Sequence, residues 1–427
     1  MHYVDMSKEE LVSVQKELMH KFNEIKEKNL KLDMSRGKPS PAQLKVSYPM
    51  LDCITSESSL IDENGVDCSN YGCLDGLESA KQLLADMIGT DKDHMIVFGN
   101  SSLNIMFDQI SRAFTHGYLG HTPWSKLDKI KFLCPVPGYD RHFMITEHFG
   151  IEMINVPMTP EGPDMDLVEK LVSEDPAIKG IWCVPKYSNP QGYTYSDETV
   201  RRFAALTPAA PDFRIFWDNA YAIHHLYDDR QDQLLEILSE CEKAGHPDMV
   251  FEFCSTSKVS FAGSGIAAIA SSKANLDDMR KSMTIQTIGY DKINQLRHVR
   301  YFKDINGIRE HMKKHAAIMR PKFEAVLKVL DEELGGLGIG SWTKPNGGYF
   351  ISFDAMDGCA KAIAAKCKEA GVTLTGAGAT FPYKKDPKDS NIRIAPSFPT
   401  PEEMAMATDL FVLCVKMVSV DKLLENK

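Results

Sequence analysis

The chain has 427 residues, of which 43% are hydrophobic and 25% are charged, and its formal net charge is −10. This length predicts two or three domains with enough apolar material for a large core. The negative charge argues against nucleic acid or an anionic membrane surface as a partner. Because no run of about 18 apolar residues exists, we expect no membrane span.

The ten cysteines are scattered along the chain without a close Cys-x-x-Cys pair. We expect them to be reduced, buried residues of a cytoplasmic protein, and residues 1–5 carry no pattern of a secretion signal. No group of cysteines and histidines has the spacing of metal ligands, so no metal site is predicted. The neighbouring His224 and His225 are interpreted as a local structural pair.

Short apolar runs alternate with helical segments through the first two thirds of the chain. A capping box at residues 7–10 predicts the start of an N-terminal helix, and a second helix is predicted over residues 76–88. Three expected strand and helix pairs follow, at residues 95–98 with 102–114, 130–134 with 140–148, and 151–156 with 165–172. This alternation predicts crossover units in a mostly parallel sheet with helices on both faces, an α/β fold.

The pattern changes after about residue 270. The later elements are a long helix at residues 308–334, a strand at 348–353, a helix at 359–370, short strands at 372–375 and 392–395, and a final helix from Pro401. We interpret this tail as a smaller α+β domain that the N-terminal helix joins. The predicted division is a large domain at residues 46–305 and a small domain made of residues 1–45 and 306–427.

Three polar motifs each follow an apolar run that predicts a strand. They are Asn-Pro-Gln-Gly at residues 189–192, Asp-Asn-Ala-Tyr at 218–221 and Ser-Thr-Ser-Lys at 255–258. Because ligands bind at the carboxyl ends of strands in an open α/β sheet, we expect the motifs to meet. Pyridoxal phosphate requires such a set: a lysine that bonds to it, a carboxylate for the pyridine nitrogen and donors for the ring oxygen.

Each motif alone also has an ordinary structural interpretation. Asn189 would lie in a surface turn, Asp218 would cap a turn at a strand end, and Lys258 would be a surface lysine. Against the last alternative, Lys258 follows a buried type of segment and lies between serines and a glycine-rich stretch. Partial burial would lower the pKa of its amine and make it a nucleophile and a base.

A phosphate site and a ring-stacking residue are also predicted after strands. Residues 98–103 combine a strand end, a glycine turn and a helix start, where backbone N–H groups and the hydroxyls of Ser101 and Ser102 would hold a phosphate. The alternative is that one of these serines is a plain N-cap. Tyr139 follows the strand at residues 130–134 and would either stack on the ring or be a core aromatic.

Taken together, these motifs resemble the class I/II aminotransferase family of fold-type-I pyridoxal-phosphate enzymes. Within that family the chain is similar to the divergent aspartate aminotransferase branch, whose members carry Ser-Arg-Gly-Lys-Pro near the N-terminus, as residues 35–39 do here. The resemblance covers the chain from about Leu32 to the last helix. It implies the fold of that family, the cofactor pyridoxal 5′-phosphate and a homodimer.

The resemblance also implies roles for individual residues. The expected catalytic set is Lys258, Asp218 and Tyr221. Lys258 would bond to the cofactor and shuttle a proton, and Asp218 would pair with the pyridine nitrogen. The other expected cofactor contacts are Asn189 and Tyr221 at the ring oxygen, Tyr139 on the ring face, Ser101, Ser102, Ser255 and Ser257 at the phosphate, and Tyr71 at the phosphate of the neighbouring subunit. The substrate α-carboxylate would be bound by Arg393, with Gly37 and Asn189.

The chain departs from many relatives in one respect. They carry an arginine seven or eight residues after the lysine as a phosphate partner, whereas Gly265 and Ile266 occupy these positions here. The candidate replacements are Arg36, Lys38 and Lys273. For the distal carboxylate of an acidic substrate, the partner subunit would supply Lys292 or Arg297.

The predicted function is a ping-pong transamination between aspartate or glutamate and 2-oxoglutarate or oxaloacetate. Two alternatives on the same scaffold are a transaminase for alanine or aromatic substrates, and a lyase or decarboxylase. A third is a non-catalytic regulator that binds the cofactor. Such regulators carry an N-terminal DNA-binding domain, whereas the pattern that precedes the resemblance here is one amphipathic helix.

Overall fold

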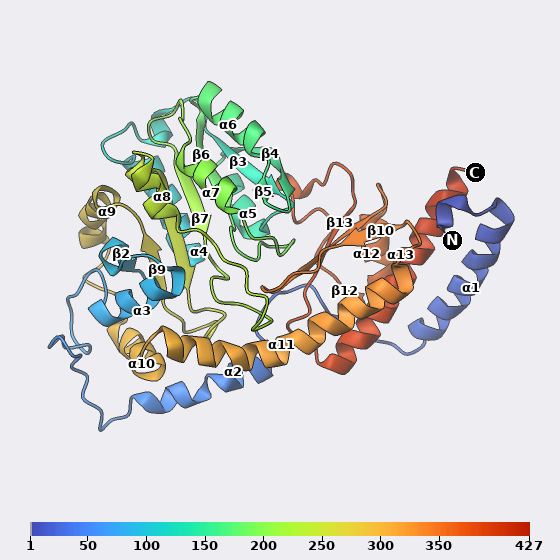
Figure 1. The fold of residues 1–427 in the computed structure, drawn as a ribbon, viewed down its shortest axis with the longest axis horizontal. Coiled ribbons are helices and arrows are strands. Elements are labelled where there is room, and N and C mark those ends of the chain that lie inside the picture. The colour runs from blue at the N-terminus through green and yellow to red at the C-terminus, as the bar shows by residue number, and fades with distance from the viewer. Residues whose placement is uncertain (1) are drawn as a thin grey trace.

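The computed structural model describes residues 2–427 and is built around an eight-stranded sheet. The strand order is β2 (Met95–Val97), β9 (Ala267–Ala270), β8 (Val250–Ser255), β7 (Arg214–Asp218), β6 (Ile178–Cys183), β3 (Lys131–Val136), β4 (Glu152–Thr159) and β5 (Gly162–Pro163). The strands from β8 to β4 are parallel, and β2, β9 and β5 pair in antiparallel fashion. The predicted mostly parallel sheet is therefore confirmed (Figure 1).

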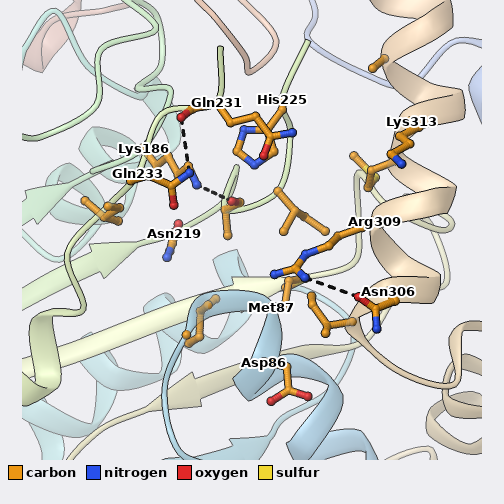
Figure 2. A pocket seen from close by; sticks show the side chains of 18 of the residues that line it. Asp86, Met87, Lys186, Asn219, His225, Gln231, Gln233, Asn306, Arg309 and Lys313 are labelled. Atoms are coloured by element: carbon orange, nitrogen blue, oxygen red, sulfur yellow. Dashed lines mark hydrogen bonds between the residues drawn. The ribbon is translucent and has the colours of Figure 1, made fainter. Parts of the chain in front are cut away.

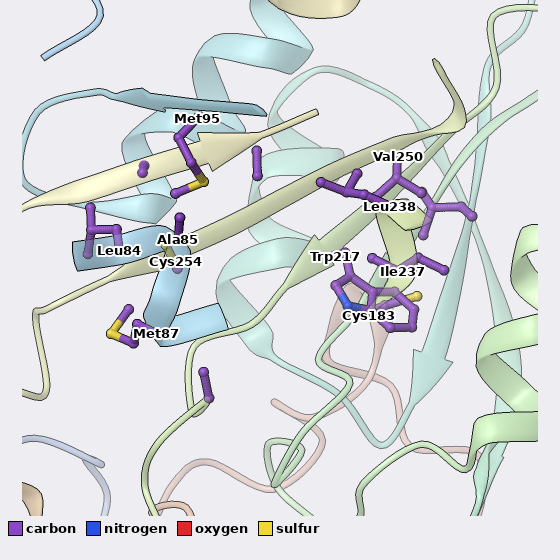
Figure 3. Packing of buried hydrophobic residues seen from close by; sticks show 14 of the residues in the cluster. Leu84, Ala85, Met87, Met95, Cys183, Trp217, Ile237, Leu238, Val250 and Cys254 are labelled. Carbon is purple, nitrogen blue, oxygen red and sulfur yellow. The ribbon is translucent and has the colours of Figure 1, made fainter. Parts of the chain in front are cut away.

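Helices cover both faces of this sheet (Figure 1). They are α3 (Glu78–Ile88), α4 (Ser102–Thr115), α5 (Asp140–His148), α6 (Met165–Glu174), α7 (Asp197–Ala204), α8 (Ile237–Lys243) and α9 (Lys273–Gln286). Successive residues of a strand point to opposite faces. Accordingly, Trp217 of β7 packs in one apolar cluster with residues of α3, α6, α7 and α8, part of which Figure 3 shows. Its neighbour Phe216 packs in a second cluster with residues of α4, α5 and α9.

A long helix connects the large sheet with the C-terminal part of the chain. After α10 (Lys292–Phe302), α11 (Ile305–Leu334) runs from the side of α3 toward a smaller sheet of order β10 (Gly340–Trp342), β11 (Ile351–Ala355) and β13 (Asn391–Ile394) (Figure 1). The remaining elements are α2 (Pro41–Val46), α12 (Ala360–Glu369), α13 (Pro401–Glu425), and the short strand β12 (Val372–Thr373), which pairs with β1 (Leu32–Asp33).

The N-terminal helix α1 (Lys8–Lys26) lies beside the last helix (Figure 1). Apolar residues of α1 and α13 share one buried cluster, and Gln15 Nε2 donates to Asp421 Oδ1 at 2.6 Å. The predicted capping box is confirmed, because the side chains of Ser7 and Glu10 each accept from the other's backbone N–H.

Some predicted boundaries differ from the structure. Strand β11 starts at Ile351 rather than at residue 348, because Gly347 and Gly348 pack closely against Tyr187 and Gly348 has a φ of 82°. Strand β12 ends at Thr373. No helix within residues 2–427 is long and apolar enough to cross a membrane. The division into domains at residues 45 and 305 stays a prediction.

Candidate active site

The three polar motifs meet at the carboxyl ends of β6, β7 and β8. Asn189, Tyr221 and Lys258 line one cavity of about 700 Å³. Tyr139, from the turn before α5, and Arg393, from β13, line the same cavity. The structure therefore gathers residues from separate strand ends of the large sheet and from the smaller sheet around one space.

Lys258 is half-buried, and its remaining exposure faces this cavity. Its Nζ lies 5.1 Å from the centroid of the Tyr221 ring. Burial lowers the pKa of the Lys258 amine, and the negative charge of Asp218 opposes this shift by a smaller amount. The site thus contains an amine that loses its proton more readily than an exposed lysine does.

Asp218 is the last residue of β7, and it is 3% exposed. Its Oδ2 lies 2.9 Å from His142 Nε2. The other carboxylate oxygen, Oδ1, is buried and has no hydrogen-bond partner within residues 2–427. Because a buried acceptor without a partner is unfavourable, this oxygen is suited to a donor from a bound molecule, such as a protonated ring nitrogen.

No sequence motif pointed to His142, which is a further residue of this site. Its ring stacks on Trp182, with centroids 4.5 Å apart and an angle of 11° between the planes, and this stacking orients the imidazole toward Asp218. Its position relative to Tyr139 could have indicated its role, because His142 lies three residues after Tyr139 at the start of α5. Side chains with that spacing are neighbours on a helix, and the two rings are 4.9 Å apart.

The two tyrosines of the cavity remain protonated. Burial raises the pKa of Tyr139 and of Tyr221, and the nearby charge of Asp218 adds to both shifts. Tyr221 also stacks on Tyr349, with centroids 5.9 Å apart, and the Tyr349 hydroxyl accepts a hydrogen bond from Gln43 Nε2 at 3.0 Å. Each phenol is therefore a hydrogen-bond donor at neutral pH, and the Tyr221 ring is fixed by its neighbours.

Arg393 is 7% exposed and is held by two oxygen acceptors. Its Nη1 donates to Asp140 Oδ1 at 3.0 Å and to Asn189 Oδ1 at 3.2 Å. The guanidinium lies 4.8 Å from the centroid of the Phe350 ring. Gly37 lines the same cavity and approaches that ring so closely that a Cβ atom would lie 2.1 Å from Phe350 Cζ. Gly37 and Arg393 therefore both pack against the ring of Phe350.

The serines predicted for the phosphate lie around the start of α4. Ser257 Oγ donates to Asn100 O at 3.5 Å, and Ser255 Oγ donates to Ser257 Oγ at 3.2 Å. Ser101 occupies the N-cap position of α4, yet its side chain makes no capping hydrogen bond. Its hydroxyl, the hydroxyl of Ser102 and the first N–H groups of the helix suit an anion at the positive end of the helix dipole.

Three residues that the resemblance assigns to the partner subunit's site do not line the cavity of their own chain. Tyr71 is 81% exposed in the loop before α3. Lys292 is buried, and its Nζ donates to Gly72 O at 2.9 Å, next to Tyr71. Arg297 Nη2 donates to Ser264 Oγ at 2.8 Å. Both cations thus already have partners within this chain.

The three cations predicted for the phosphate fall in two places. Arg36 and Lys38 line the cavity together with Ser35 and Gly37. Lys273 is exposed in the first turn of α9 and pairs with Asp277 four residues later, at 2.6 Å. Only the segment at residues 35–38 therefore brings a predicted phosphate cation to the site.

A second cavity, of about 400 Å³, lies between the chain after β7 and the first turns of α11 (Figure 2). Lys186 Nζ donates there to Ala222 O at 2.8 Å, and burial lowers the pKa of this amine to about 8. Arg309 Nη1 donates to Asn306 Oδ1 at 3.5 Å. None of the predicted site residues lines this cavity, so it is separate from the site around Lys258.

Almost the whole chain matches known proteins. A family model described as aspartate amino-transferase matches residues 6–427. The chain belongs to the aspartate aminotransferase family. An aspartate aminotransferase from Corynebacterium glutamicum is 44% identical over 98% of this chain and 96% of its own length.

Solved structures of aminotransferases agree with this membership. The crystal structure of an aspartate transaminase from Corynebacterium glutamicum has a TM-score of 0.96 and 44% identity, and covers 99% of each chain. The α-aminoadipate aminotransferase of Thermus thermophilus, solved with N-(5′-phosphopyridoxyl)-L-leucine, shares the fold. Its TM-score is 0.72 at 19% identity, over 91% of this chain and 92% of that one.

The residues of this aminotransferase fit pyridoxal phosphate, the cofactor of its family. The unpartnered Oδ1 of Asp218 suits the ring nitrogen. Lys258 presents its amine to the same cavity as Tyr139, which suits a bonded and stacked ring. The uncapped hydroxyl of Ser101 at the start of α4 suits the phosphate. Each polar group of the cofactor thus has a counterpart in the chain.

Proposed function

We propose that this aminotransferase moves an amino group between aspartate or glutamate and 2-oxoglutarate or oxaloacetate. The observation that carries the proposal is the charge of the cavity: besides Lys258, five lining residues within residues 2–427 are cationic, and the single acidic one is Asp140. That acid is paired with Arg393 at 3.0 Å. Such an excess of positive charge favours a substrate with two carboxylates over one with an apolar side chain. The relatives named for aspartate support the same choice.

Pyridoxal phosphate, when bonded to Lys258, would supply an electron sink for the substrate Cα. The chain supplies the groups that hold the cofactor in place. Asp218, oriented by His142, would keep the ring nitrogen protonated through its opposite charge. The Asn189 amide and the Tyr221 hydroxyl would donate to the ring oxygen, and Tyr221 can do so because its pKa is raised.

Two residues act on the substrate itself. Arg393 binds the α-carboxylate with its planar guanidinium, which Asp140 and Asn189 hold in orientation. Lys258 would hold the cofactor, and its amine, when free, would remove the proton from the substrate Cα. Burial favours the neutral amine that this proton transfer requires. The same lysine serves both half-reactions of a ping-pong sequence.

We also propose that the enzyme is a homodimer of the cytoplasm. Tyr71 is 81% exposed and does not line the cavity of its own chain, which suits a residue that contacts the phosphate in the neighbouring subunit. A symmetric pair is the commonest form of oligomer. All ten cysteines are free, which suits a reducing compartment.

A panel of amino donors tests the substrate proposal. Aspartate or glutamate alone should change the absorbance of the bound cofactor, and 2-oxoglutarate should restore it. We expect kcat/KM for aspartate to exceed that for alanine by at least about a hundredfold, because an apolar side chain leaves the cations of the cavity without a carboxylate partner. Equal values for alanine would contradict the dicarboxylate preference. Release of ammonia without an oxo-acid acceptor would indicate a lyase instead.

A further inference from the structure

The cavity around Lys258 is lined by four exposed cations. They are Arg36, Lys38, Arg141 and Lys384. None of the four forms an ion pair within residues 2–427, since the single lining acid, Asp140, pairs with Arg393. Asp33, the nearest acid in sequence to two of them, accepts hydrogen bonds from Ser35. Cations without an ion-pair partner around a concave site attract an anion, so the position of each of the four decides which end of a substrate it can bind.

The position of Arg141 follows from that of the preceding residue, Asp140. Asp140 is the first residue of α5, and its carboxylate holds Arg393 at 3.0 Å. Arg141 therefore extends from the same turn of helix that orients the proposed α-carboxylate site, and it lines the cavity beside it. A second carboxylate, two or three carbons from the first, lies within the reach of such a long side chain.

The position of Arg36 follows in a similar way from that of the next residue, Gly37. Gly37 packs against Phe350, and the same ring lies under the guanidinium of Arg393, 4.8 Å from its centroid. Arg36 thus lines the cavity one residue away from the packing that supports Arg393. Both arginines are adjacent in sequence to groups that fix the α-carboxylate end.

The two lysines of the cavity are placed differently. Lys38 Nζ lies over the Phe398 ring, 3.9 Å from its centroid, so its charge already makes a cation–π interaction. Lys384 lies in the turn after residue 381 with a φ of 56°. A lysine also lacks the planar fork that binds a carboxylate with two parallel hydrogen bonds.

We infer that Arg36 and Arg141 of the same chain bind the distal carboxylate of the substrate, rather than Lys292 or Arg297 of the partner subunit. The inference rests on the proposed dicarboxylate function. In this arrangement one chain binds both ends of the substrate, with Arg393 at the α-carboxylate and the two other arginines at the far end. Lys292 and Arg297 keep the partners that they have in their own chain, Gly72 O and Ser264 Oγ.

The test compares the binding of succinate and butyrate to the cofactor-loaded enzyme by calorimetry. These two ligands have equal chain length and differ by one carboxylate. In the wild-type enzyme succinate should bind more tightly. Arg36→Gln and Arg141→Gln should each weaken succinate by about tenfold or more and leave butyrate within about twofold, since only succinate has a distal carboxylate. Arg201→Gln, which removes an exposed arginine outside the cavity, is the matched control and should change neither ligand.

The outcomes separate this inference from the function on which it rests. If the wild-type enzyme binds succinate and butyrate equally, the dicarboxylate function itself fails. If the preference exists but survives in both arginine variants and disappears in Lys292→Gln or Arg297→Gln, the distal site belongs to the partner and the inference is overturned. Equal weakening of both ligands in the arginine variants also overturns it, because the effect would then lie at the shared carboxylate. Thermal melts of each variant verify that it is folded.

Discussion

Adding one methyl group at Gly37 tests whether the packing under Arg393 supports substrate binding. A Cβ atom at this position would lie 2.1 Å from Phe350 Cζ and 2.5 Å from Cε1, whereas carbon atoms in contact lie about 3.5–4.0 Å apart. The ring must therefore move by more than about 1 Å. Phe350 is 4% exposed, and the Arg393 guanidinium lies over it, so the ring cannot move without displacing Arg393.

The expected effect of Gly37→Ala follows from that displacement. Overpacking of this kind costs about 1–3 kcal/mol, and a shift of about 1 Å in a positioning group can reduce the rate about a hundredfold. We expect kcat/KM for aspartate to fall by about that factor, mainly through KM, while the absorbance of the bound cofactor is retained. The assay is steady-state transamination with aspartate and 2-oxoglutarate, with circular dichroism melts to measure stability.

Gly263→Ala is the matched control for this substitution. It adds the same methyl group five residues after Lys258, where no atom lies within 4 Å of the new Cβ, and should leave kcat/KM within about twofold. If Gly37→Ala keeps aspartate activity within about threefold of the wild type, the contact from Gly37 through Phe350 to Arg393 does not position the substrate carboxylate.

Four other substitutions test separate parts of the structure. Lys258→Ala should abolish borohydride labelling of the chain and lower transamination at least about a thousandfold; label on another lysine would contradict its role. Asp218→Ala should leave the cofactor bonded but slow proton removal from the substrate by about a thousandfold, whereas near-normal turnover would make this carboxylate structural. Mixing Tyr71→Ala with Lys258→Ala chains should restore activity in hybrid dimers, each with one intact site, and a fully active monomer in ultracentrifugation would refute shared sites. Glu252 is buried, and burial strongly raises the pKa of its carboxyl group. Because this group loses its proton at lower pH in the unfolded chain than in the folded chain, its ionisation favours unfolding as the pH rises. Glu252→Gln should therefore raise Tm by about 2 °C at pH 8 and by less at pH 5.

The centre of the site was predictable from the sequence because it depends on local motifs and one topological rule. Asn189, Asp218 and Lys258 each follow a strand whose residues read as buried, and all residues of β7 are indeed buried. Parallel strands present their carboxyl ends at one edge of a sheet. The order of the motifs along the chain was therefore enough to predict that they meet at one edge of the sheet, where Asn189, Tyr221 and Lys258 line one cavity.

The rim of the site was not predictable in the same way. Arg36 was named from the sequence only as a candidate for the phosphate, and no pattern around the exposed Arg141 distinguishes it from other surface arginines. They line one cavity only because the segment before α2 passes beside α5 and β13. The contact between Gly37 and Phe350 likewise joins opposite ends of the chain. Local sequence patterns encode the shape of each segment, but not which distant segment it contacts.

The structure gives a physical reason for the absence of an arginine after Lys258. A Cβ atom at Gly265 would lie 3.0 Å from Thr256 Oγ1 and 3.1 Å from the backbone nitrogen of Ser257, so a side chain at this position would require these neighbours to shift. Ile266 is 1% exposed and belongs to the apolar cluster that also contains Trp217. An arginine at residue 266 with the same orientation would bury its charge in that cluster, which is strongly unfavourable.

Hydroxyl groups and one imidazole hold the Lys258 loop in the place of that arginine. Thr256 Oγ1 accepts from the backbone N–H of Ile266 at 2.9 Å and lies 3.1 Å from His298 Nε2, and Ser260 Oγ lies 2.8 Å from the same nitrogen. His298 Nδ1 lies 2.7 Å from a backbone carbonyl oxygen, which only accepts, so Nδ1 carries the proton and the single lone pair of Nε2 accepts from one of the two hydroxyls. Burial lowers the pKa of His298 to about 4, and the ring therefore stays neutral at neutral pH. The loop is thus fixed on both sides of Lys258 without a cation, which in our proposal leaves the phosphate to serine hydroxyls and the start of α4.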